Sequence, residues 1–190
     1  RLHPLLALRD AVEKWGRETI LMLFLGAHWR KPMDYTDETL AAAKARAEGL
    51  APLAFIRSWA VAAVDPGGQL LMGPSLAIPM ALERAGLQLS DVDLIEMHEA
   101  FAAQVASNIQ ALESDRWARE NLGRAERVGM VDRERLNVGG GSIALGHPFG
   151  ATGARITTSL AREMARREAK FGLLSVCAQG GMGFAMVLER

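Results

Sequence analysis

A single histidine, His147, lies inside a glycine-rich segment that reads Gly139-Gly-Gly-Ser-Ile-Ala-Leu-Gly-His-Pro-Phe-Gly150. Glycine allows backbone conformations that other residues avoid and lets a ligand approach main-chain N–H groups closely. A histidine titrates near neutral pH and can move protons. We therefore interpret His147 as a catalytic residue, with a structural histidine as the alternative that the segment leaves open.

Two further reactive side chains, His98 and Cys177, each come at the end of a predicted strand. Cys177 is the only cysteine, and two glycines follow it closely. Main-chain N–H groups beside a thiol can bind an oxyanion, and a thiol near a histidine can give up or deliver a proton. A buried core cysteine is the alternative. Glu99, next to His98, has a second reading as a carboxylate in the first turn of a helix over 100–112.

Strands and helices alternate along the sequence after residue 50. Apolar runs and turn residues predict strands at 53–64, 94–97, 171–177 and 183–188, with Val138 in or beside another strand. Helices are expected over 74–84, 100–112 and 150–169, and the charged segment 113–135 is expected to be surface helix and loop.

This order of elements predicts an α/β fold, in which a layered mixed sheet carries helices on both faces and ends in an antiparallel strand pair. Ligands bind beyond the carboxyl ends of strands in such sheets. We therefore expect His98, the glycine-rich segment and Cys177 to converge. Residues 1–49 are poorly matched to this pattern and are predicted to form a separate N-terminal segment before a domain at 50–190.

Composition excludes several classes of function. The 22 Lys and Arg residues balance 22 Asp and Glu residues, so nothing favours nucleic-acid binding, and a near-neutral charge is compatible with homo-oligomers. One cysteine gives no internal disulfide and fits a reducing, cytoplasmic setting. No apolar run reaches the ~18–20 residues of a membrane span. No metal site is expected, because the reactive residues lack the spacing of zinc ligands, and the phosphate-binding and dinucleotide-binding glycine motifs are absent.

Three motifs together resemble the C-terminal half of a thiolase: His98-Glu-Ala-Phe101, the segment Gly139–Arg155, and Cys177-Ala-Gln-Gly-Gly-Met-Gly183. The resemblance extends from about Leu50 to the end of the chain. A histidine at the start of the first motif is similar to the branch that acts in fatty-acid β-oxidation, which includes the β-subunit of the trifunctional enzyme. The resemblance implies a thiolase-like fold and cleavage of 3-ketoacyl-CoA by CoA into acetyl-CoA and a shortened acyl-CoA. It implies CoA as a substrate, no separate cofactor, a homo-oligomer, and a hydratase/dehydrogenase subunit as a partner.

The resemblance also implies roles for single residues. His147 matches the base that activates a nucleophilic cysteine and later donates to an oxyanion hole. Cys177 matches the second cysteine, which moves a proton to or from the CoA sulfur or the substrate α-carbon. His98 takes the place of an asparagine that holds a water in the oxyanion hole.

Four more positions match residues near the substrate. Met72, Ala100 and Phe101 match the lining of the pantetheine tunnel. Gln179 stands where many thiolases have glycine or alanine, and its backbone N–H would face the thioester oxygen.

The nucleophilic cysteine of thiolases belongs to an N-terminal half that this sequence does not match, and Cys177 lies in a different motif. We therefore expect no turnover by this chain alone. Two alternatives stay open: a non-catalytic acyl-CoA-binding half-domain, or a truncated remnant. A β-ketoacyl synthase is disfavoured by Pro148 and Cys177.

Overall fold

The structure, a computed structural model, describes residues 13, 14, 16, 17, 49 and 53–190. The chain divides into two compact units, Arg1–Pro52 and Leu53–Arg190. Nearly all of the segment 1–49 lies outside the described residues. The fold of the second unit is as follows. Among the described helices, none combines the length and apolar character needed to cross a membrane.

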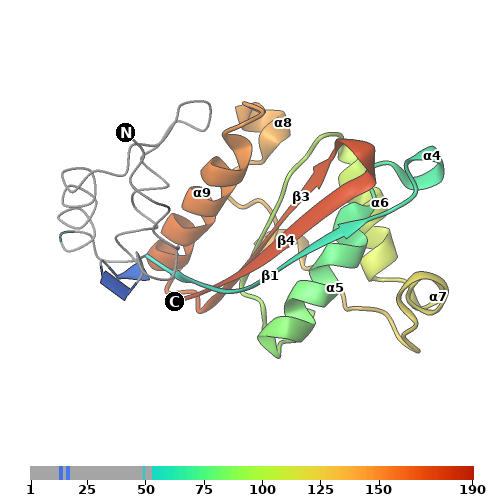
Figure 1. Ribbon diagram of the computed structural model, residues 1–190, viewed down its shortest axis with the longest axis horizontal. Helices are drawn as coiled ribbons and strands as arrows, with labels where there is room; N and C mark the ends of the chain where they lie inside the picture. The colour runs from blue at the N-terminus through green and yellow to red at the C-terminus, as the bar shows by residue number, and fades with distance from the viewer. Residues whose placement is uncertain (1–12, 15, 18–48, 50–52) are drawn as a thin grey trace. The chain divides into compact units, whose positions relative to one another are not determined.

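Four strands form one mixed sheet in the order β1-β4-β3-β2 (Figure 1). Their bounds are Phe55–Ala63 for β1, Leu94–Met97 for β2, Phe171–Ala178 for β3 and Met182–Glu189 for β4. The final pair β3–β4 is antiparallel, as predicted, and so is β1–β4, whereas β2 runs parallel to β3. The parallel pair brings the end of β2, and with it His98, beside β3, where the His98 N–H donates to the Ser175 carbonyl (2.8 Å).

The edge strand β1 is not straight. Its register against β4 shifts between Ile56 and Ser58, which marks a β-bulge at Arg57. The guanidinium of Arg57 turns from this bulge to Glu189, with Nη1 to Oε2 at 2.7 Å, and to the Ala85 carbonyl, with Nε to O at 2.9 Å.

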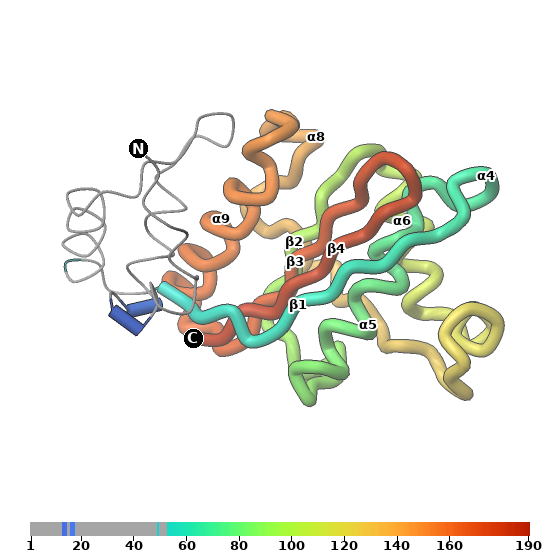
Figure 2. Tube along the Cα trace, in the orientation of Figure 1, coloured from blue at the N-terminus to red at the C-terminus, as the bar shows by residue number. Residues whose placement is uncertain are grey.

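Helices cover both faces of the sheet, as the sequence predicted (Figures 1 and 2). Their bounds are α4 Pro66–Gln69, α5 Gly73–Ala85, α6 Ala102–Leu112, α7 Asp115–Trp117, α8 Ser142–Leu145 and α9 Thr152–Arg167, with single turns η1 Leu89–Asp91, η2 Ala118–Leu122, η3 Arg133–Arg135 and η4 Gln179–Gly181. α5 ends, as predicted, at Gly86, whose φ of 69° favours glycine.

Alternation along β3 and β4 divides the core in two. Leu173 and Val187 pack with Ile78 of α5 and the apolar residues of α6. Their neighbours Leu174 and Leu188 face the other way and pack under α9. Because successive side chains of a strand point to opposite faces, the same two strands provide apolar residues to the helices on both faces. Burial of each such aliphatic side chain stabilises the fold by about 1.5–3 kcal/mol.

The first residue of α5 lies directly against the start of β4. A Cβ on Gly73 or on Gly183 would overlap the backbone of the other residue, so both positions require glycine. This close approach fixes Met72, the residue before α5, next to the β3–β4 turn.

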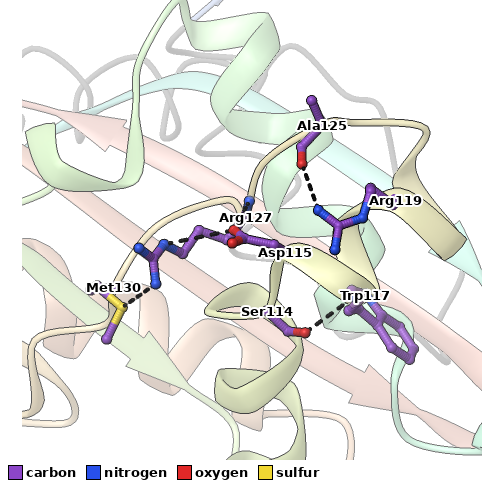
Figure 3. A network of polar contacts seen from close by, with 7 residues as sticks. All are labelled: Ser114, Asp115, Trp117, Arg119, Ala125, Arg127 and Met130. Carbon is purple, nitrogen blue, oxygen red and sulfur yellow. Dashed lines mark hydrogen bonds and ion pairs between the residues drawn. The ribbon is translucent and has the colours of Figure 1, made fainter.

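The charged segment 113–135 is surface helix and loop, as expected, and polar contacts hold it together (Figure 3). Ser114 caps α7, because its Oγ accepts the Trp117 N–H at 3.1 Å. Asp115 accepts the Arg127 N–H at 3.0 Å, and Arg119 donates to the Ala125 carbonyl at 3.2 Å.

The strand expected at Val138 is replaced by a single bridge and a side chain. Leu136 makes one isolated parallel bridge to Ile95. Asn137, with φ of 48°, then turns the chain and pairs its own side chain with the Met97 backbone: Oδ1 accepts the N–H (2.8 Å) and Nδ2 donates to the C=O (3.0 Å). The strand prediction is wrong here, because the Asn137 side chain makes the two hydrogen bonds to the Met97 backbone that a neighbouring strand would make.

Candidate active site

The glycine-rich segment is fastened to the end of β2 by Glu99. Its carboxylate accepts hydrogen bonds from the Asn137 Nδ2 (2.8 Å) and from the Ile143 N–H (3.0 Å). A Cβ on Gly141 would overlap this carboxylate, so the Glu99 side chain would have to shift away from its present hydrogen bonds. The reading of Glu99 as a first-turn residue is wrong: α6 begins at Ala102, and Glu99 instead holds the segment that carries His147.

His98 is buried at the end of β2, with 3% of its surface exposed. Its Nδ1 lies 2.7 Å from the Ser142 Oγ. The same oxygen accepts a hydrogen bond from Arg155 Nη2 of α9 (2.9 Å). A chain of polar contacts therefore connects the first turn of α9, through α8, to the buried imidazole.

His147 lies against His98 but on the solvent side. The two ring centroids are 4.2 Å apart with an interplanar angle of 38°, and His147 is exposed whereas His98 is buried. The Nδ1 of His147 is 2.7 Å from Thr152 Oγ1, at the first residue of α9. The structure thus brings together two of the predicted site residues, 49 positions apart in the sequence, at one strand end.

Burial and neighbouring charge act on the ionisable groups here. Burial lowers the pKa of His98 below its usual value, and the nearby His147 and Arg155 lower it further, so His98 is neutral at pH 7. Two residues before His98, burial raises the pKa of Glu96 from 4.5 to about 7, with Arg155 opposing the shift.

Cys177 lies near the end of β3, opposite Gly183 of β4, and is buried. Burial raises the pKa of its thiol, while hydrogen bonds from its own backbone and from that of Ala100 oppose the rise. Ala100 is two residues after His98, so the thiol lies at the same strand end as the histidines. A thiol with a raised pKa is protonated at pH 7 and suits proton donation. Direct pairing of Cys177 with His147 stays a prediction.

The four residues expected near the substrate lie in segments that follow β2, follow β3 or precede α5. Met72 and Ala100 are half-buried, Phe101 is 64% exposed, and Gln179 is exposed in the turn η4. Met72 directly precedes Gly73, which packs against the backbone of Met182 and Gly183 at the start of β4. Their contact with CoA stays a prediction.

Sequence reasoning missed the polar residues that hold the two histidines. Ser142, Thr152 and Arg155 stand within the glycine-rich motif, but nothing in their spacing indicates which ring each contacts. One feature of the sequence could have indicated them. Glycine or alanine would pack as closely as serine or threonine here, so a hydroxyl within a run of small residues indicates a hydrogen bond.

Within the described part of the chain, no three His, Cys, Asp or Glu side chains gather as metal ligands would. The groups at this strand end can instead move protons and donate hydrogen bonds: two imidazoles, one thiol and the amides of a glycine-rich loop.

Comparison with known proteins agrees with this arrangement. The family model described as "Thiolase, C-terminal domain" matches residues 50–190. The chain belongs to the thiolase family. It is 56% identical over 146 residues to the 3-ketoacyl-CoA thiolases of Citrobacter koseri and Escherichia coli, which covers 77% of this chain and 34% of each relative.

The thiolase fold is equally clear from solved structures. The acetyl-CoA acetyltransferase of Bacillus anthracis superposes with a TM-score of 0.60 at 42% sequence identity, over 77% of this chain and 32% of that one. The chain therefore spans about a third of the length of the thiolases it matches.

Proposed function

We propose that this thiolase chain supplies the proton-transfer part of an active site that cleaves 3-ketoacyl-CoA with CoA. The observation that carries the proposal is the contact between His98 and His147, with the protonated thiol of Cys177 at the same strand end. The names of the 56% identical relatives support the substrate class.

The reaction needs a nucleophilic thiolate from outside these 190 residues, since Cys177 is the only cysteine. His147 takes the proton of that thiol, and the thiolate attacks the C3 carbonyl of the substrate. The C2–C3 bond then breaks, and Cys177 protonates the leaving carbanion to give acetyl-CoA.

The second half-reaction restores the enzyme. Cys177, now a thiolate, takes the proton of an incoming CoA thiol, and the CoA sulfur attacks the acyl-enzyme thioester. The shortened acyl-CoA leaves and the nucleophile returns. In both halves negative charge develops on a thioester oxygen, where the His98 ring and the backbone N–H of Gln179 act as hydrogen-bond donors. Each donor in a site of this kind lowers the activation free energy by about 3–4 kcal/mol.

A chimera tests the proposal. The part of the Escherichia coli 3-ketoacyl-CoA thiolase that matches this chain is replaced by the matching residues of this chain. CoA-dependent loss of 3-ketoacyl-CoA is then measured. His147→Ala and Cys177→Ala should each lower kcat by about 10²–10⁴-fold, whereas Thr158→Ala, at an exposed residue of α9, should leave it unchanged.

Two results would contradict the proposal: a folded chimera without turnover, or near-normal turnover of His147→Ala. CoA binding without turnover in a folded chimera would favour the non-catalytic acyl-CoA-binding role.

The proposal includes a homo-oligomer in the cytoplasm, with a hydratase/dehydrogenase subunit as partner. A balanced net charge and a single cysteine support the first two parts. Light scattering on the purified chimera measures its oligomeric state, and co-purification with a hydratase/dehydrogenase chain tests the third part.

A further inference from the structure

The two adjacent histidines differ in the hydroxyl group that each ring contacts, and the hydroxyls differ in where their own protons go. For His147, the contact is Thr152 Oγ1, which itself donates to the Pro148 carbonyl (3.2 Å). Threonine hydroxyls near a helix start commonly donate to the carbonyl four residues earlier, and with its proton there the Thr152 hydroxyl can only accept from the imidazole. In a neutral ring this arrangement puts the His147 proton on Nδ1 and leaves Nε2 as the acceptor.

For His98 the direction is reversed. Ser142 Oγ accepts a hydrogen bond from Arg155 Nη2, so its own proton remains to be placed. Among the described residues, the only acceptor recorded at hydrogen-bond distance from this hydroxyl is His98 Nδ1. An O–H that is buried without an acceptor costs about 1–3 kcal/mol. Donation from Ser142 to Nδ1 leaves the proton of the neutral His98 ring on Nε2.

We propose that the two adjacent rings are held in opposite tautomers, His98 with its proton on Nε2 and His147 with its proton on Nδ1. Ser142, oriented by Arg155, is the positioning residue for His98, and Thr152 is the positioning residue for His147. One ring then presents a hydrogen-bond donor and its neighbour presents a proton acceptor, although both are imidazoles with ring centroids only 4.2 Å apart.

The difference between the rings gives each a separate task. A neutral ring with a proton on Nε2 can stabilise a developing oxyanion, and it does not compete for the proton of a nucleophile. The neighbouring ring with a free Nε2 can take that proton. These tasks rest on the proposed function, whereas the tautomers themselves rest only on the hydrogen bonds of Ser142, Thr152 and Arg155.

The tautomers can be measured without substrate or turnover. Long-range ¹H–¹⁵N correlation spectra of the ¹⁵N-labelled 190-residue chain, recorded at a pH where the rings are neutral, separate the two forms of each histidine. His98→Gln and His147→Gln assign the signals among the 4 histidines. The expected result is an Nε2–H form for His98 and an Nδ1–H form for His147.

Paired variants identify the positioning residues. Ser142→Ala should lower the ratio of the Nε2–H to the Nδ1–H form of His98 by about tenfold, the value of one net hydrogen bond, and leave His147 unchanged. Ser142→Thr, which keeps the hydroxyl, should restore the ratio. Thr152→Val should shift His147 alone, and the surface variant Thr158→Val should shift neither ring.

The same tautomer on both rings of the unmodified chain would overturn the proposal, and this spectrum decides even if a variant fails to fold. A folded Ser142→Ala variant with an unchanged His98 signal would also overturn it. The spectra are recorded without substrate or turnover. A negative result here therefore does not contradict the proposed function, and an inactive chimera does not contradict the tautomers.

Discussion

The two faces of the sheet are built from different chemistry. Under α5 and α6, Ile78, Leu173, Val187 and their neighbours form an apolar core. Under α9, a smaller apolar cluster around Leu160 and Met164 continues into buried polar groups at the end of β2.

This difference separates stability from chemistry within one small domain. An apolar face gains free energy from burial without any demand on direction, whereas each polar group on the other face must find a partner. On the α9 side Arg155 and Ser142 hold His98, and Glu96 is buried near the same arginine. The free energy gained by burying the apolar core on the opposite face offsets the free-energy cost of burying these polar groups.

The largest expected effect lies on the apolar face. Ile78→Ala removes a fully buried side chain of α5 and should lower the free energy of unfolding by about 2–5 kcal/mol. Urea unfolding of the full chain measures it. Ile143→Ala, at a residue 63% exposed, is the matched control and should change stability by about 0.5 kcal/mol or less. Similar losses in the two variants would remove the distinction between core and loop.

The buried carboxyl of Glu96 should make the polar face sensitive to pH. Since its pKa is raised from 4.5 to about 7, the folded state holds a proton that the unfolded state releases. Its contribution to stability is complete below pH 4.5 and is lost as pH rises through 7, by about 3 kcal/mol at pH 7.

Glu96→Gln removes this dependence. The difference in unfolding free energy between Glu96→Gln and the unmodified chain, measured from pH 4 to 8, should therefore grow with pH in favour of the variant. Glu126→Gln, at an exposed carboxylate, serves as the control. A difference that does not vary with pH would show that Glu96 is not buried as an acid.

Gly141→Ala tests the attachment of the glycine-rich segment to Glu99. A Cβ at Gly141 overlaps the Glu99 carboxylate, so the hydrogen bond to Ile143 must lengthen or break, at a cost of about 1–3 kcal/mol. Gly139→Ala is the matched control, because a Cβ there meets nothing within 4 Å. Equal unfolding midpoints for the two variants would contradict the close approach.

The smallest effect is expected on the outer surface of α9. Hydrogen bonds from Arg166 and Arg167 lower the pKa of Glu163 to about 2, so its contribution is present above pH 4.5 and is lost as pH falls through 2. Solvent and salt screen this exposed cluster, and Glu163→Gln should cost less than about 1 kcal/mol at pH 7. A loss that persists undiminished in 1 M salt would argue against an ion pair.

Local patterns predicted much of the fold. The bounds of β2 are those expected from the sequence, α5 stops at Gly86, and the last two strands pair antiparallel. These features depend on hydrophobic period and on glycine, both of which act within a few residues of the chain.

The missing strand at Val138 and the partners of the histidines depend on contacts between distant residues. Asn137 meets Met97, and Ser142 meets His98, across 40 and 44 positions. No local hydrophobic pattern indicates such a contact, because a single amide or hydroxyl group in a loop is enough to make the hydrogen bond. The motifs placed His98, His147 and Cys177 at strand ends, but the polar atoms that orient the rings emerge only when the chain is folded.

The bulge at Arg57 has a consequence for how this chain behaves beside other copies. Among the described residues, β1 pairs with a strand on one side only, and such an edge, beside the exposed Trp59 and Val61, is a template for adding a foreign strand. Fibrous aggregates grow by additions of this kind. The register shift between Ile56 and Ser58, near the start of β1, bends the edge, so an incoming straight strand cannot keep a regular ladder along its whole length. A single extra residue in β1 thereby discourages open-ended polymer growth at this edge.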